Sequence, residues 1–245
     1  MRLTRYALAV LCMLILLSNS SSSRFTKQIV KETGSPESGL SVTDNTAINS
    51  SALYSAWDLG SAGLSKEAFE KAYKGFTVLQ AKNLVKNCNL LTIVDYSMSS
   101  IQKRLFVLEM TTGKILFNSL VAHGRNSGVD HATNFSNSGA SYKSSLGFFI
   151  TLDTYKGSNG YSLKLKGCEN GINNNALNRA IVMHGADYVS ENFIRRNGYL
   201  GRSHGCPAVP VDLSKKIIDV IKNGSCMFLY YPSKNYINRS KILNS

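Results

Sequence analysis

From Leu90 onward the sequence is a series of short, apolar, β-branched runs separated by turn residues, which limits the chain to a mainly β fold. The runs are LLTIVDYS, RLFVLEM, KILFNSLVAH, SSLGFFITLDTY, GYSLKLKG, RAIVMHG and SCMFLYYP. Each has the length of a strand, and TTGK between the second and third runs is typical of a hairpin turn. The pattern predicts a twisted β-sandwich or a partly open barrel with a few helices.

Helical periodicity precedes these runs and recurs between them. Apolar side chains repeat at helical spacing over residues 64–79, with Ser65 as the expected N-cap, and we expect this helix to be interrupted or to end near Gly75. SENFIRRNG predicts a short helical excursion. DLSKKIIDVIKNG predicts a helix that is capped by Asp212 and closed at Gly224.

The N-terminus, residues 1–23, has the three-part layout of a secretory signal peptide. Arg2 and Arg5 precede an apolar run from Tyr6 to Leu17, and small polar residues follow. The run is short for a membrane span. We therefore expect an exported protein of the periplasm or cell envelope; an uncleaved anchor and a lipoprotein lipidated on Cys12 are the alternatives.

Composition divides the remaining chain into four segments. Residues 24–60 are rich in Ser, Thr, Asn and Gly and predict a flexible linker, and residues 61–87 predict an N-terminal helical segment. The β-rich domain spans 88–233, and 234–245 is a polar, basic tail. The formal charge of +13 falls to +11 (13 − 2) without Arg2 and Arg5. This charge favours an anionic polymer, and export argues against nucleic acid; solubility alone is an equal explanation.

The stretch SHGCPAVP, residues 203–210, has the parts of a nucleophilic site. A cysteine attacks as the thiolate, which requires a base for its proton and hydrogen-bond donors for the oxyanion. Gly205 allows close backbone approach, and the N–H groups of Gly205 and Cys206 are the expected donors. His184 is the expected base if the intervening segment folds back. The other cysteines are Cys12, Cys88, Cys168 and Cys226, and if Cys206 is free, at most one disulfide can form among the last three.

Two histidines share one pattern in this sequence. His123 and His184 each end an apolar run and precede a glycine, where a rigid sheet gives way to a loop. Either one could be a hydrogen-bonded structural histidine. His123, His184, His204 and Cys206 could also form a zinc site, although ligands two residues apart on a glycine turn are unusual. A buried, inert Cys206 is the remaining alternative.

The run HGADYVSENFIRRNGYLGRSHGCPAVP resembles the catalytic stretch of the YkuD-type L,D-transpeptidase superfamily, in which a His-Gly lies some twenty residues before a Ser-x-Gly-Cys. The runs VAHGRNSG, FSNSGASYKSSLGFFIT, YKGSNGYSLKLKG and GINNNALNRAIVMHGADY resemble one branch, the murein L,D-transpeptidase catalytic-domain proteins. The resemblance covers roughly Leu90 to Pro232, and implies a YkuD-like β-sandwich.

The resemblance assigns roles to individual residues. Cys206 matches the nucleophile, His184 matches its paired histidine, and the backbone around Gly205 matches the oxyanion hole. The branch has Trp at the position of His204, and many superfamily members carry an Arg after the cysteine, where this chain has Pro207 and Ala208. The catalytic candidates are therefore Cys206, His184, His204 and Gly205, and the substrate-binding candidates are His123, Arg202, Gly185 and Ser203, with Arg202 as the replacement anchor.

The resemblance also implies an activity. It is an exported cysteine acyltransferase that forms 3→3 cross-links between peptidoglycan stem peptides through a thioester on Cys206. It implies no metal or organic cofactor, and carbapenem-type β-lactams as covalent inhibitors. The alternatives are an L,D-carboxypeptidase with the same site, a non-catalytic wall-binding module, and a Cys-His peptidase that acts on ordinary protein.

Overall fold

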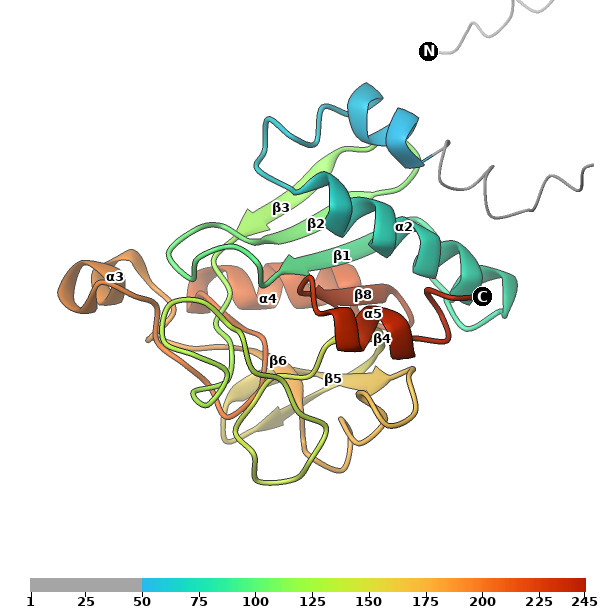
Figure 1. Cartoon of the computed structure of the whole chain (residues 1–245). Helices are drawn as coiled ribbons and strands as arrows, with labels where there is room; N and C mark the ends of the chain where they lie inside the picture. The colour runs from blue at the N-terminus through green and yellow to red at the C-terminus, as the bar shows by residue number, and fades with distance from the viewer. Residues whose placement is uncertain (1–49) are drawn as a thin grey trace, which may run out of the picture. The chain divides into compact units, whose positions relative to one another are not determined.

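The computed structural model describes residues 50–245, whose centre is one eight-stranded sheet with the order β3-β2-β1-β8-β4-β5-β6-β7 (Figure 1). The strands are β1 (Leu90–Asp95), β2 (Leu105–Glu109), β3 (Ile115–Ser119), β4 (Gly147–Gly157), β5 (Gly160–Gly167), β6 (Val182–Gly185), β7 (Ala208–Val209) and β8 (Cys226–Tyr230). Every predicted run contributes a strand, and the TTGK turn joins the antiparallel pair β2 and β3. The sequence did not reveal β7, which has only two residues.

The two edges of the sheet meet, so the sheet forms a partly open barrel. Ala122, just beyond the end of β3, makes an antiparallel bridge with Ala208 of β7. Its N–H donates to the Ala208 carbonyl over 2.8 Å. Because β3 and β7 are the edge strands, this bridge closes much of the gap between them. The predicted mainly β, partly open barrel is confirmed.

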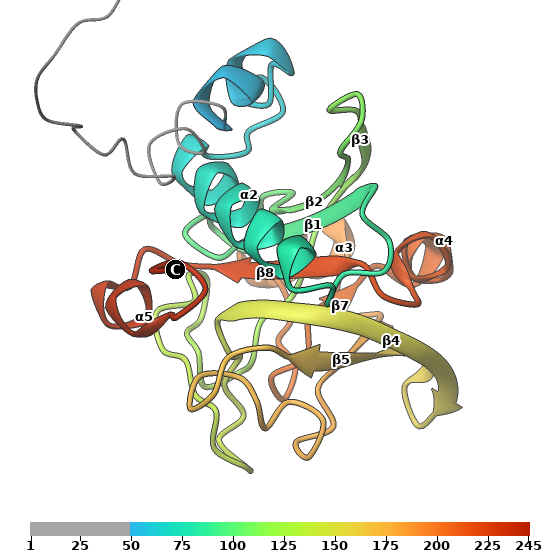
Figure 2. The ribbon, with the colours of Figure 1, turned by 90° about the vertical axis from the view of Figure 1, so that its right-hand side faces the viewer.

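Helices cover the sheet on two sides (Figures 1 and 2). Helix α2 (Lys66–Ala81) packs against β1 and β8, whereas α4 (Val211–Ile221) packs against β5 and β6. Phe69 and Phe76 of α2 and Ile217 of α4 are buried in the core. Burial of each such side chain stabilises the fold by about 1.5–3 kcal/mol. The apolar faces therefore fix both helices on the barrel.

The N-terminal helix begins as predicted but continues past the expected break. The Ser65 hydroxyl accepts from the Ala68 N–H, which confirms the N-cap. The helix runs unbroken through Gly75 to Ala81. A Cβ at Gly75 would lie 1.9 Å from the Phe148 ring, so this glycine permits close packing of α2 on β4 and does not end the helix.

The termini of α4 differ from the prediction. The N-cap is Pro210 and no side chain caps the helix, while Asp212 lies in the first turn, where its charge complements the helix dipole. The helix ends at Ile221, before Gly224. Gly224 has φ +106° and its N–H donates to the Thr151 carbonyl.

The end of the predicted flexible linker and the predicted polar, basic tail both contribute to the folded domain. Residues 50–56 are helical, Leu59 is fully buried, and the Trp57 ring packs edge-on against Phe69 at 5.9 Å, so the predicted linker 24–60 extends too far. The predicted tail forms α5 (Lys234–Arg239), whose buried Tyr236 donates to Glu169 over 3.1 Å. The predicted signal peptide and residues 24–49 lie outside the described residues.

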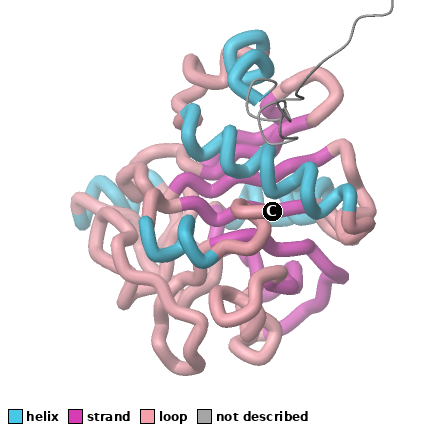
Figure 3. The backbone as a smooth tube through the Cα atoms, turned by 45° about the vertical axis from the view of Figure 1, so that its right-hand side comes forward, coloured by secondary structure: helices cyan, strands magenta, loops and turns pink. Residues whose placement is uncertain are grey.

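Long loops gather at one end of the sheet (Figure 3). One of them carries α3 (Glu191–Asn197), the predicted short excursion, which begins at Ser190 and ends at Gly198 with φ 78°. This excursion lies between β6 and β7 and brings the chain back beside β6. Within residues 50–245, no helix has both the length and the apolar character that a membrane crossing needs.

Candidate active site

The parallel pair β6 and β7 brings Cys206 beside His184. His184 pairs with Ala208, and continuing that register by two residues places Cys206 beside Val182. The Val182 N–H does donate to the Cys206 Sγ over 3.5 Å. Cys206 therefore lies just before β7 and contacts β6 at a position two residues before His184.

A short hydrogen-bonded turn holds the cysteine. The Ser203 hydroxyl accepts from the Gly205 N–H at 3.0 Å and donates to the Cys206 carbonyl at 2.6 Å. Gly205 has φ +122°, which side chains other than glycine rarely adopt. Ser144 adds a bond to the Gly205 carbonyl at 3.3 Å. Ser203, predicted to bind substrate, is buried and instead fixes this turn.

The turn leaves one backbone donor available beside the thiol. The Gly205 N–H, predicted to be an oxyanion donor, already donates to the Ser203 hydroxyl in this structure. The Cys206 N–H has no hydrogen-bond partner among the described residues. In this arrangement Cys206 itself provides the free donor for an oxyanion.

The Cys206 thiol is nearly enclosed, with 8% of the residue exposed. The Sγ contacts the Ala180 carbonyl at 3.8 Å as well as the Val182 N–H. Burial raises the pKa of the thiol above its usual value, while the Val182 N–H and the positive charge of Arg179 oppose that rise. The resting side chain is consequently a thiol at neutral pH.

His184 has one engaged ring nitrogen and one free one. The Nδ1 lies 2.9 Å from the Gly185 carbonyl, and because a carbonyl can only accept, Nδ1 carries the proton. The Nε2 of the neutral ring is then left with a lone pair and has no partner among residues 50–245. Burial lowers the pKa of His184, partly offset by the bond to Gly185. The ring is therefore a neutral base, and no hydrogen bond joins it to the resting thiol.

His123 belongs to the interior rather than to a cleft wall. It is fully buried, and its Nδ1 lies 2.7 Å from the Nη2 of Arg104, itself fully buried. A guanidinium can only donate, so Nδ1 accepts and Nε2 donates to the Gly128 carbonyl at 3.2 Å. Burial, with the charge of Arg104, lowers the pKa of His123 to about 4. The predicted substrate-binding role does not fit a ring with both nitrogens engaged.

The other predicted site residues lie around the turn. His204 is exposed and its ring packs on Tyr142 at 4.6 Å, while Arg125 covers Tyr142 at 4.2 Å. Arg202 donates to the carbonyls of Arg125 and Gly128 and has no interaction with Cys206. At Gly185 a Cβ would lie 2.7 Å from the Ser214 hydroxyl, so this glycine lets α4 pack close to β6.

The charged residue beside the nucleophile is Arg179, which the sequence analysis missed. Its guanidinium donates to the carbonyls of Ser136 and Lys143 and to the hydroxyls of Ser141 and Ser145. Arg179 is the first residue of the RAIVMHG run, and its acceptors lie some forty residues earlier. No local motif marks such a contact.

The remaining cysteines differ from Cys206 in their surroundings. All four described cysteines are free: Cys88 is exposed, Cys168 is partly buried, and Cys226 is buried. Burial raises the pKa of Cys168 to about 12 and that of Cys226 well above its usual value. Within the described chain, no three His, Cys, Asp or Glu side chains meet in a group that could hold a metal ion.

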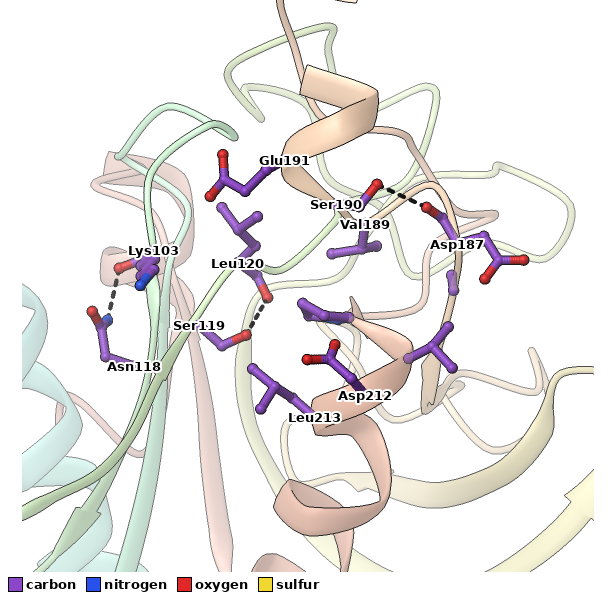
Figure 4. Close-up of a pocket in the computed structure, with 13 residues that line it drawn as sticks. Lys103, Asn118, Ser119, Leu120, Asp187, Val189, Ser190, Glu191, Asp212 and Leu213 are labelled. Atoms are coloured by element: carbon purple, nitrogen blue, oxygen red, sulfur yellow. Dashed lines mark hydrogen bonds between the residues drawn. The ribbon is translucent and has the colours of Figure 1, made fainter. Parts of the chain in front are cut away.

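A pocket of about 550 Å³ lies beyond the ends of β6 and β7 (Figure 4). Its lining includes Leu120, Val189 and Leu213, with the carboxylates of Glu191 and Asp212 at the first turns of α3 and α4. Neither Cys206 nor His184 lines it. The register of β6 and β7 locates the reactive centre, and the size of this pocket does not.

A comparison with models of known protein families identifies the family of this chain. A model described as the L,D-transpeptidase catalytic domain matches residues 61–230. Similar solved structures include an L,D-transpeptidase from Mycobacterium smegmatis, with 13% identity and a TM-score of 0.37, over 58% of this chain and 59% of that one. An L,D-transpeptidase from Stackebrandtia nassauensis has 14% identity and a TM-score of 0.36, over 75% and 77% of the two chains. A search among curated proteins found no match.

Proposed function

Because the chain belongs to the L,D-transpeptidase catalytic-domain family, we propose that it is an exported cysteine acyltransferase acting on peptidoglycan stem peptides. One observation carries the proposal beyond the family. The only cysteine in a Ser-His-Gly turn contacts β6, the strand that carries His184, a neutral histidine whose Nε2 has no partner among residues 50–245. A buried thiol and an adjacent base are the minimum for nucleophilic acyl transfer.

The proposed reaction proceeds through a thioester. His184 Nε2 takes the proton of the Cys206 thiol, and the thiolate attacks the main-chain carbonyl of the third stem residue. The oxyanion accepts from the Cys206 N–H. When the carbon–nitrogen bond breaks, the amine of the terminal D-residue leaves with the proton from His184. A side-chain amine of a second stem then attacks the thioester, which forms the 3→3 amide and returns the thiol.

The experiment is to incubate the purified protein, and Cys206→Ala, with isolated sacculi. We expect the wild type to release the terminal D-residue and to form 3→3 dimers, both absent with Cys206→Ala. Tripeptides without dimers would indicate an L,D-carboxypeptidase, and binding without release would indicate a wall-binding module. Cleavage of ordinary protein instead would indicate a Cys-His peptidase.

A β-lactam provides a second, wall-independent test of the nucleophile. The strained lactam carbonyl can be opened by a thiolate, so we expect a carbapenem to add once, on Cys206. Intact-mass spectra should show one adduct in the wild type and in Cys88→Ala, and none in Cys206→Ala. An adduct that survives in Cys206→Ala would remove Cys206 from the proposed role.

A further inference from the structure

Arg179 lies three residues before the start of β6, and its guanidinium is held by hydrogen bonds. Its two terminal nitrogens make four hydrogen bonds, at 2.7 Å to the Ser136 carbonyl, 2.6 Å to the Ser145 hydroxyl, 3.3 Å to the Ser141 hydroxyl and 2.6 Å to the Lys143 carbonyl. These acceptors all lie in the loop before β4. The guanidinium therefore has one fixed position between this loop and β6.

The charge of Arg179 is not neutralised by a carboxylate. All four acceptors are neutral, and none of the ion pairs among residues 50–245 includes Arg179. Two neutral hydroxyls and two carbonyls accept from its terminal nitrogens but leave its full positive charge. Such an arrangement fixes a cation without cancelling its electric field.

This cation lies against the nucleophile turn. The Nη2 of Arg179 is 3.3 Å from the position that a Cβ on Gly205 would take. The Cys206 thiol contacts the carbonyl of Ala180 and the N–H of Val182, on the segment that directly follows Arg179. The charge of Arg179 interacts electrostatically with Cys206, in the direction that lowers the pKa of the thiol.

Within residues 50–245, Arg179 is the one cation that offsets the burial of Cys206. His184 is neutral at neutral pH because burial lowers its pKa. Tyr96 and Tyr188 also interact with Cys206, but burial raises the pKa of each to about 12, so both stay neutral. Among the described groups that interact electrostatically with Cys206, Arg179 alone is charged.

We propose that Arg179 is a positioning residue that fixes a positive charge beside Cys206 and thereby stabilises its thiolate for attack. The inference rests on the proposed function only in taking Cys206 as the nucleophile. Beside a more exposed cysteine, a protonated histidine would stabilise the thiolate. Here the hydrogen-bonded guanidinium of Arg179 supplies part of that stabilisation. His184 then moves the proton, and Arg179 stabilises the charge that remains on sulfur.

The test measures the alkylation rate of Cys206 by iodoacetamide against pH, with peptide mass spectrometry as the readout. All variants carry Cys88→Ser, because the exposed Cys88 would otherwise react. An opposite charge within about 4–6 Å lowers a pKa by about 1–3 units. We therefore expect Arg179→Gln, which keeps amide donors for the loop, to raise the thiol pKa by about one unit and to slow alkylation at pH 8 about tenfold. Arg179→Lys should restore much of the rate.

Two matched controls separate charge from architecture. Arg202→Gln removes an equal charge that has no contact with Cys206, and Ser141→Ala removes one hydrogen bond but keeps the charge; both should leave the thiol pKa unchanged. An unchanged profile in folded Arg179→Gln, or an equal shift in Arg202→Gln, would overturn the proposal. If the wild type forms no cross-links, the proposed function is contradicted, but the dependence of Cys206 alkylation on pH still tests the role of Arg179.

If Arg179→Gln does not fold, a pair of variants at Ala180 tests the proposal instead. Ala180 is exposed and has φ +52°, a conformation in which Asn and Asp are favoured. Ala180→Asp places a carboxylate next to Arg179, whereas Ala180→Asn has the same shape without charge. We expect the thiol pKa to be higher in Ala180→Asp than in Ala180→Asn. Equal values in the two variants would count against a charge-stabilised thiolate.

Discussion

His123-Gly124 and His184-Gly185 have the same setting in the sequence but opposite settings in the structure. Each histidine ends an apolar run, yet His123 has both ring nitrogens bonded and is fully buried, whereas His184, on the strand that Cys206 contacts, has an Nε2 without a partner among residues 50–245. The difference teaches that a strand-end histidine becomes a base only when its second nitrogen is left without a partner. Where a buried Arg104 takes the first nitrogen and a carbonyl the second, the ring supports the fold instead.

The largest effect expected from this difference between His184 and His123 is on the rate of Cys206 acylation. His184→Ala removes the base, and loss of a general base typically costs ~10²–10⁴-fold in rate. We expect carbapenem acylation of Cys206, followed by mass spectrometry, to fall within that range while the melting temperature changes little. Because the pKa of His184 lies below its usual value, the wild-type rate should fall only at pH values below about 6.5, where the imidazole becomes protonated. A variant that acylates at the wild-type rate would show that His184 is not the base.

His123→Ala should have the reverse signature. It leaves a cavity and removes the acceptor of the buried Arg104, which we expect to lower the free energy of unfolding by about 4 kcal/mol. Below its melting temperature the variant should acylate within tenfold of the wild type. Urea unfolding and the acylation assay check the two halves, and His123→Gln, which offers one acceptor and one donor, should recover part of the stability.

The His123 ring should make the free energy of unfolding depend on pH. Its pKa is about 4 in the folded state and about 6.5 when unfolded, so the unfolded chain binds more protons between those values. The contribution of His123 to the free energy of unfolding is therefore fully present above pH 6.5. It is lost as pH falls toward 4, by up to ~3 kcal/mol. In His123→Gln the slope of unfolding free energy over this window should be smaller than in the wild type; an equal slope would assign it to other groups.

The same contrast shows which features the sequence could predict. The strands follow from local patterns, because a strand buried on both faces is apolar throughout its length. The Ser65 cap is also a local feature, because it immediately precedes its helix. The neighbourhood of Cys206 was also local, since Ser203, Gly205 and Cys206 are adjacent in sequence. The partner of His123 was not local: Arg104 lies 19 residues away, and no pattern pairs them.

The other features that the sequence did not predict also depend on partners far away in the sequence. Arg179 binds a loop some forty residues earlier, and α5 is buried through Glu169, 67 residues before Tyr236. Composition predicted a flexible linker through residue 60 and a polar, basic tail over 234–245, but large side chains such as Leu59 and Tyr236 are buried in the domain. Burial of that kind depends on tertiary contacts that sequence periodicity does not contain.

The smallest expected effect concerns His204, the third histidine near the nucleophile. Unlike His123 and His184, it is exposed, and its ring packs on Tyr142 without a hydrogen bond to any described residue. A ring that only packs can be replaced by another ring, and Trp offers a larger face for the same contact. We therefore expect His204→Trp to keep the acylation rate within about threefold of the wild type and to keep its pH profile. His204→Ala should lose somewhat more, because the Tyr142 contact disappears. If His204→Trp instead removed the low-pH limb that His184→Ala leaves in place, the base would be His204, and the contrast between the two histidine-glycine strand ends would have to be drawn again.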